Sequence, residues 1–196
     1  PLPRHALMGL TGHAWHTCLA TRGQVSVLPS GPADLDWRAM VERYARTGYR
    51  WERFGLELPA DSPWDDLRSA AVEWGISHLD AGRPLLGWDF HLHEHGIVAG
   101  YDRTRGGLLV EDILTAELGP FVLWDAWPTA ATGRIELFAP VEAVESDPFE
   151  TIGGALQTAL DCFEGKDGPE DGQPRGTAAI EAWADGFDGD TEVDRA

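Results

Sequence analysis

The sequence predicts an α+β fold in which an antiparallel sheet packs against helices. Helical periodicity occurs toward both ends of the chain, and the middle holds short segments with the composition of strands. The connections between those segments are too short for crossover helices, so the strands are expected to run antiparallel. Helices, then strands, then helices is the order of an α+β domain rather than of a repeating βαβ fold.

Two helices are predicted before the sheet. The first covers about residues 34–45, with Gly48 as a plausible stop. The second begins at Ser62 and Pro63, which suit the N-cap and the first helical position, and it ends near residue 80. Helical spacing predicts a buried stripe along the second helix that consists of Leu67, Ala70, Ala71, Trp74 and Leu79.

The strands are predicted mainly between residues 84 and 141. Apolar segments alternate there with turn residues, which is typical of an antiparallel meander. A short strand is also indicated by the alternation at residues 24–27. The expected strands of the meander and its neighbour are residues 84–90, 95–101, 108–112 and 134–141.

Composition changes after the last of these strands, which predicts a division of the chain. Residues 1–145 are expected to form the α+β domain, and residues 146–196 a helical extension. Helices are predicted at 147–165 and 177–187, and the segment 165–176 is rich in Gly, Pro and charge, as flexible loops are.

Charge excludes several classes of partner. The chain has 196 residues, with 15 Lys and Arg against 33 Asp and Glu, and its formal net charge is −18. Binding to nucleic acid or to an anionic membrane surface depends on basic residues, so neither is expected.

No apolar run approaches the roughly 20 residues of a membrane span, and no signal peptide is recognisable. Two cysteines are too few for a disulfide scaffold, and reduced thiols in a cytoplasmic protein are expected. The sequence at each terminus is compatible with a native end of the protein and equally with a truncated one.

A histidine cluster is one candidate site. His91, His93 and His95 stand at alternate positions, and in an extended backbone they would project to one side. Imidazoles with this spacing can ligate zinc or another divalent metal. The alternative is a loop of solvated histidines, and no other cofactor is indicated.

A second candidate site pairs Glu94 or His95 with Asp112. A polar residue that opens one strand and an aspartate that ends the next strand of a meander can lie side by side. His95 could serve as a general base whose tautomer Asp112 fixes. The nucleophile is not identified, because Cys18 follows no clear helix start and Cys162 lies deep in a predicted helix.

Aromatic residues near the strands predict either a ligand-binding wall or core packing. Trp88, Trp124 and Trp127 surround the predicted meander, and tryptophans in a cleft can bind apolar or sugar-like ligands. The candidate ligand contacts are Trp88, Asp89 and Tyr101.

Several segments together resemble one bacterial family. These segments are GLTGHAWH (9–16), AGRPLLGWD (81–89), EHGIVAGYD (94–102), LLVED (108–112) and AAIEAWADGF (178–187). They are similar to the N-terminal domain of butirosin biosynthesis protein H, a relative of papain-like, bacteriocin-processing cysteine peptidases. The resemblance covers most of the chain and implies a papain-like fold.

The resemblance also implies a site and a chemistry. Active relatives have a cysteine at a helix start, a histidine that begins the strand ending in GYD, and an aspartate on the next strand. Glu94 stands where that histidine is usual, His95 is one residue away, and Asp112 matches the aspartate. An active site would catalyse acyl transfer or amide hydrolysis through a thioester, with an acyl carrier protein as one expected partner and the cysteine upstream of residue 1.

The departures from the family pattern favour a different interpretation, namely a degenerate or truncated domain. Such a domain would bind a cationic or peptide-like small ligand in its cleft, and the acidic composition suits a cation. Glu94 and Asp112 together could hold an amine through charge-assisted hydrogen bonds. This hypothesis requires that the two carboxylates lie on adjoining strands and face a shared pocket.

Overall fold

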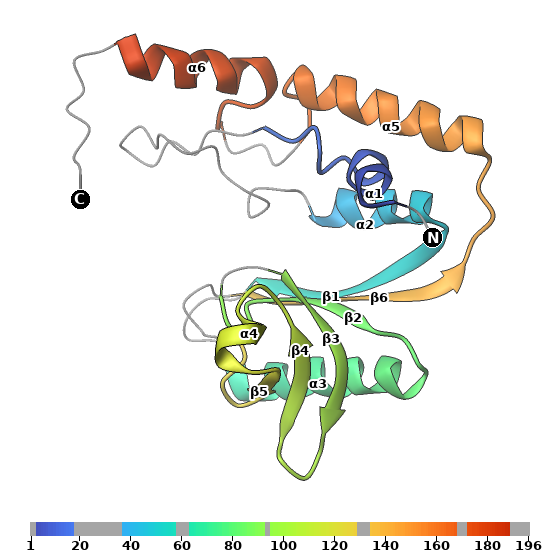
Figure 1. Cartoon of the computed structure of the whole chain (residues 1–196), viewed down its shortest axis with the longest axis vertical. Helices are drawn as coiled ribbons and strands as arrows, with labels where there is room; N and C mark the ends of the chain where they lie inside the picture. Colours follow the sequence, from blue (N-terminus) through green and yellow to red (C-terminus); the bar gives the residue numbers. More distant parts are fainter. Residues whose placement is uncertain are drawn as a thin grey trace. The chain divides into compact units, whose positions relative to one another are not determined.

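The contacts of the chain group into two compact units. The sheet unit comprises residues 49–143, and the helical unit comprises residues 1–48 together with residues 144–196. A computed structural model (Figure 1) describes residues 3–17, 37–57, 63–92, 95–128, 134–167 and 172–188. Residues 144–196 group by their contacts with the first 48 residues. The predicted division of the chain into residues 1–145 and 146–196 stays a prediction.

The sheet unit contains a six-stranded sheet in which every pairing is antiparallel. The strand order is β1-β6-β2-β3-β4-β5. The predicted meander is confirmed as β2, β3 and β4, and the α+β class is confirmed with it. The strands are β1 (Tyr49–Glu57), β2 (Leu85–Trp88), β3 (His95–Asp102), β4 (Gly107–Glu111), β5 (Phe121–Leu123) and β6 (Arg134–Ala143).

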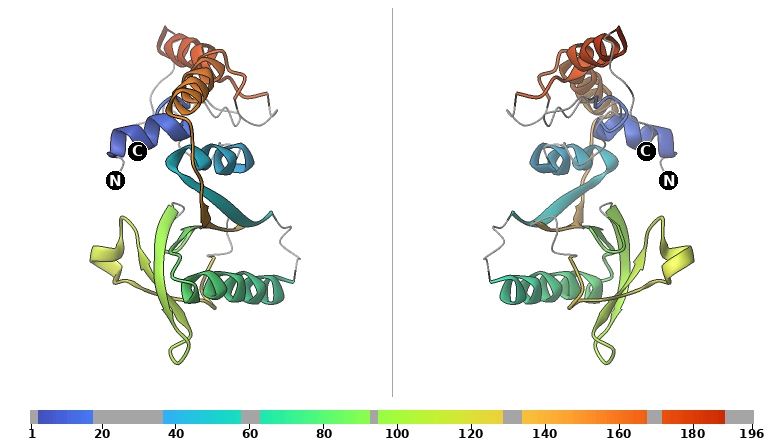
Figure 2. Two further views of the ribbon diagram at one scale, coloured as in Figure 1. Left: turned by 90° about the vertical axis from the view of Figure 1, so that its right-hand side faces the viewer. Right: turned by 90° about the vertical axis from the view of Figure 1, so that its left-hand side faces the viewer.

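One long helix packs on a single face of this sheet. Helix α3 (Trp64–Asp80) contacts β2, β3 and β6, and the turned views of Figure 2 show it running along that face. It begins one residue later than the sequence predicts, because Pro63 takes the N-cap position and Trp64 is the first helical residue. The predicted stripe is only partly correct, because Ala70 is exposed and the buried residues are Ala71, Val72, Gly75, Ile76 and His78. Helix α4 (Thr115–Leu118) is a single short turn after β4.

The helical unit contains four helices in the part of the chain that the structure describes. They are α1 (Arg4–Thr11), α2 (Trp37–Tyr44), which continues into the 3₁₀ turn η2 (Ala45–Thr47), α5 (Pro148–Phe163) and α6 (Gly176–Asp188). Asp147 caps α5 by accepting a hydrogen bond from the Phe149 N–H at 2.7 Å. The predicted helices at 34–45, 147–165 and 177–187 are thus confirmed over their described residues, whereas the strand at 24–27 lies outside them. None of the described helices combines the length and apolar character that crossing a bilayer requires.

Two glycines make room for an aromatic ring beneath the sheet. An added Cβ at Gly87 would lie 2.5 Å from the Phe90 ring, and one at Gly96 would lie 3.1 Å from the same ring. Phe90 is 3% exposed and stacks on Trp127 with 5.4 Å between ring centroids. The chain after β2 can therefore fold back under β2 and β3 only because both strands carry glycine there.

We predict that Gly87→Ala destabilises the sheet unit by about 1–3 kcal/mol, because a methyl group would overpack the Phe90 ring and Leu137. Gly100→Ala in β3 is the matched control, since its nearest neighbour would be at an ordinary contact distance of 3.4 Å. Chemical denaturation should separate the two variants, and equal stabilities would contradict this account of the packing.

Candidate active site

The chain bends sharply at the end of β2, and this bend places the candidate site. The Trp88 carbonyl accepts a buried hydrogen bond from Trp127 Nε1 at 2.7 Å. Asp89 follows in the left-handed backbone region with φ of 66°, and it is fully buried. Phe90 then enters the core, and His91 comes next along the chain.

His91 pairs with Asp112, the residue that follows β4. His91 Nδ1 lies 2.8 Å from Asp112 Oδ2, and the two side chains are only 9% and 6% exposed. The other carboxylate oxygen, Oδ1, accepts hydrogen bonds from the Leu114 N–H at 2.9 Å and the Thr115 hydroxyl at 3.1 Å. Thr115 Oγ1 in turn accepts a hydrogen bond from the Asp112 N–H at 2.7 Å. Both oxygens of Asp112 therefore have donors, and its position is fixed from two sides.

These contacts keep Asp112 ionised. Burial alone raises the pKa of this carboxyl, but the hydrogen bonds from His91, Leu114 and Thr115 outweigh burial and hold the pKa below its usual value. An ionised carboxylate accepts a hydrogen bond from Nδ1–H, which leaves the lone pair of neutral His91 on Nε2. A histidine held in this tautomer by a carboxylate is the arrangement that general-base catalysis uses.

His95 does not pair with Asp112, which corrects the sequence-based pairing. Ile97 of β3 lies opposite Glu111 of β4, so Gly96 is the residue that meets Asp112. A Cβ added at Gly96 would lie 3.1 Å from the Asp112 Cβ. Side chains alternate along a strand, and His95 consequently points to the other face of the sheet. There it makes an edge contact with Trp88 and lies near Phe138.

That other face holds a buried ionic cluster that sequence reasoning missed. Glu136 of β6 has a fully buried side chain and forms ion pairs with Arg53, at 2.6 Å, and with Arg134. Its Oε2 also lies 4.0 Å from His95 Nε2. Burial raises the pKa of Glu136, while Arg134 and Arg53 oppose that rise. A signal was available, because a glutamate inside the apolar strand RIELF is typical of a paired, buried carboxylate.

Glycine again provides the space for this cluster. The Arg53 guanidinium lies over Gly55, where an added Cβ would be 2.4 Å from the Arg53 Cζ. Because Glu136 is fully enclosed, we assign the cluster to the packing of β1 against β6 rather than to substrate contact.

The remaining predicted site residues fall into three groups. Cys18, His93 and Glu94 lie outside the described residues, so the metal site and the pairing of Glu94 with Asp112 stay predictions. Within the described ranges, no group of three or more His, Cys, Asp or Glu is arranged to hold a metal ion. Trp88 and Asp89 are buried, so Trp88 fits the alternative of core packing. Tyr101 donates a hydrogen bond to Asp80 at 2.6 Å. The ligand contacts of these three residues stay predictions.

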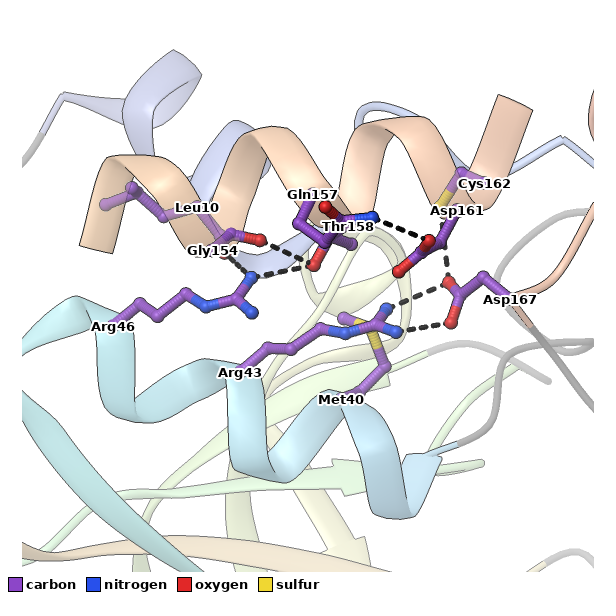
Figure 3. Close-up of polar contacts among 10 residues, drawn as sticks. All are labelled: Leu10, Met40, Arg43, Arg46, Gly154, Gln157, Thr158, Asp161, Cys162 and Asp167. Carbon is purple, nitrogen blue, oxygen red and sulfur yellow. Dashed lines mark hydrogen bonds and ion pairs between the residues drawn. The ribbon is translucent and has the colours of Figure 1, made fainter. Parts of the chain in front are cut away.

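Cys162 is unsuited to nucleophilic catalysis. Burial and the adjacent Asp167 carboxylate raise the pKa of its thiol to about 12. Figure 3 shows its sulfur directed at Asp167, whose other partner is Arg43. A thiol with that pKa carries almost no thiolate near neutral pH, and the thiolate is the reactive form.

Comparisons with known proteins return no match, either among protein-family models or among curated proteins.

We predict that Asp112→Asn lowers the free energy of unfolding by about 1–3 kcal/mol at pH 7, because a buried, charge-assisted hydrogen bond to His91 is lost. The pKa of Asp112 is depressed in the folded state, so this stabilisation is present above the unfolded pKa and disappears as the pH falls through the folded value. Urea titrations of both proteins between pH 7 and pH 3 measure the difference.

Glu111→Gln is the control, because Glu111 is the exposed neighbour of Asp112 on the opposite face of β4. Its substitution should change stability by less than about 0.5 kcal/mol. If the difference in the free energy of unfolding between wild type and Asp112→Asn stayed constant with pH, the proposed ionisation of Asp112 would be contradicted.

Proposed function

We propose that the chain catalyses acyl transfer or amide hydrolysis, with His91 as the general base and Asp112 as the carboxylate that orients it. The observation that carries this proposal is the 2.8 Å contact between His91 Nδ1 and the buried Asp112 carboxylate. Because Asp112 accepts from Nδ1, the pair leaves Nε2 as the proton acceptor.

The chemistry follows from that proton acceptor. Nε2 of His91 takes the proton of an attacking thiol, amine or water as that group adds to the carbonyl carbon of a thioester or amide. The same proton then passes to the leaving thiolate or amine as the tetrahedral intermediate collapses. The resemblance to butirosin biosynthesis protein H makes a carrier-bound thioester the favoured donor and an amine the favoured acceptor.

The papain-like resemblance supports this proposal with one change. The family pattern puts the base at position 94, where this sequence has glutamate, and the pairing with Asp112 favours His91 instead. The sheet unit contains no cysteine, and Cys162 is excluded by its environment. No thiol is assigned as the nucleophile, and the alternative is a base that activates the acceptor directly.

Direct binding of an amine by Glu94 and Asp112 is less well supported. Three donors already contact the Asp112 oxygens, and the Asp112 side chain is only 6% exposed, which leaves little access for the amine of a ligand. A pocket of about 240 Å³ in the sheet unit does contain Asp65, Glu73, Asp125 and Trp124. Two of its carboxylates are neutralised by Arg68 and Arg103, which weakens its attraction for a cation.

We predict that His91→Gln and Asp112→Asn each lower kcat/KM by 10²-fold or more for aminolysis of an acyl-N-acetylcysteamine thioester. Loss of the base removes proton transfer, and asparagine allows the wrong imidazole tautomer. Glu111→Gln is the folded control and should retain activity. Full activity of His91→Gln would contradict the assignment. In a separate test, the activities of Cys18→Ser and Cys162→Ser decide whether a thiol of this sequence takes part in the reaction.

A further inference from the structure

Helix α5 presents its large apolar side chains outward. Phe149 is 86% exposed, and the other four members of this stripe are between 49% and 60% exposed. We call these residues the α5 stripe: Phe149, Ile152, Leu156, Leu160 and Phe163. Exposed apolar side chains gathered on one helix face are typical of an interaction surface rather than of a free surface.

The face of α5 opposite the stripe is packed against the rest of the helical unit. Its inner face consists of small residues, and Arg46 of the helical unit donates hydrogen bonds to Thr158 Oγ1 at 2.9 Å and to the Leu10 carbonyl at 3.2 Å (Figure 3). An added Cβ at Gly154 would lie 3.3 Å from the Arg46 guanidinium. The inner face of α5 is therefore fitted closely to Arg46, and the α5 stripe lies on the other side of the helix.

The α5 stripe is symmetric about Leu156 in both spacing and chemistry. Ile152 and Leu160 lie four residues before and after Leu156, and Phe149 and Phe163 lie seven residues before and after it. An antiparallel pair of helices related by a two-fold axis brings positions at equal distances on either side of the centre together. Phenylalanine would meet phenylalanine, and aliphatic side chains would meet aliphatic side chains. A two-fold interface requires a self-complementary surface of this kind.

The apolar surface extends beyond the helix. Ile152 and Leu156 also line a pocket of about 590 Å³ whose other walls include Leu10 and Trp15. The two phenylalanines alone expose on the order of 250 Å². Together with the aliphatic residues and the pocket, the surface approaches the roughly 800 Å² per partner of a stable interface.

We propose that this surface binds a second copy of the chain, through antiparallel packing of α5 on the partner's α5 about Leu156. Each copy has a formal net charge of −18, so two copies repel each other electrostatically. Salt screens this repulsion, so the dimer tightens as ionic strength rises. A basic partner would instead bind the acidic chain more weakly in salt.

Sedimentation equilibrium of the full chain tests the association. We expect wild type to have twice the monomer mass, with a dissociation constant that falls between 0.05 M and 1 M salt, and Leu156→Asp to have the monomer mass with an unchanged melting temperature. Ile113→Asp, at a position 72% exposed in the sheet unit, is the control and should stay dimeric. A monomeric wild type at about 100 μM in high salt, or a dimeric Leu156→Asp, overturns the proposal.

Disulfide cross-linking tests the geometry in a background with Cys18→Ser and Cys162→Ala. Leu156→Cys should cross-link with itself, whereas Phe149→Cys should not, because about 21 Å separates the two copies of position 149 along the helix axis. Phe149→Cys mixed with Phe163→Cys should cross-link. Self-cross-linking of Phe149→Cys, or none in any combination, overturns the antiparallel arrangement.

Discussion

A buried carboxylate is retained in a protein only when its oxygens are hydrogen-bonded, and Asp112 meets this condition with three donors on its two oxygens. Two of those donors, Leu114 and Thr115, come from the turn that follows β4. The third is His91, which comes from the bend that follows β2. The carboxylate therefore joins two segments that are distant in sequence, and the direction of the His91 ring depends on it.

Packing on one face of the sheet unit contributes to this pairing. Gly87 and Gly96 leave room for Phe90, Phe90 stacks on Trp127, and Trp127 holds the Trp88 carbonyl. The bend that delivers His91 is thus determined by packing beneath the sheet. On the opposite face, Glu136 with its two arginines fixes β1 against β6 without contributing to the His91–Asp112 pair.

The sequence predicts much of the fold but only part of the site. The meander, α3 and α5 have clear periodicity and clear end signals, and they are confirmed. Strand β1 was missed because a bulge between Arg50 and Trp51 interrupts its alternation, and because Arg53 occupies an inward position that only the pairing with Glu136 permits. Asp112 was identified as a site residue, but its partner was not. The register of β3 on β4 turns His95 away, and the path of the bend to His91 depends on an aromatic contact that no local pattern encodes.

The α5 stripe shows a related limit of pattern analysis. Apolar residues at helical spacing indicate an amphipathic helix, but they do not indicate whether the apolar face is turned inward. The small inner face of α5 settles this, since Arg46 and Thr158 already occupy the inside. The same sequence therefore specifies both a packed helix and an uncovered surface.

The central claim is that Asp112 fixes the tautomer of His91, and the most direct measurement is a ¹⁵N-correlated NMR spectrum of the histidine rings in the intact protein. The account predicts that neutral His91 carries its proton on Nδ1 with Nε2 unprotonated, and that Asp112→Asn shifts the ring toward the Nε2–H form. A wild-type His91 protonated on Nε2, or a ring whose tautomer is unchanged by Asp112→Asn, would contradict it.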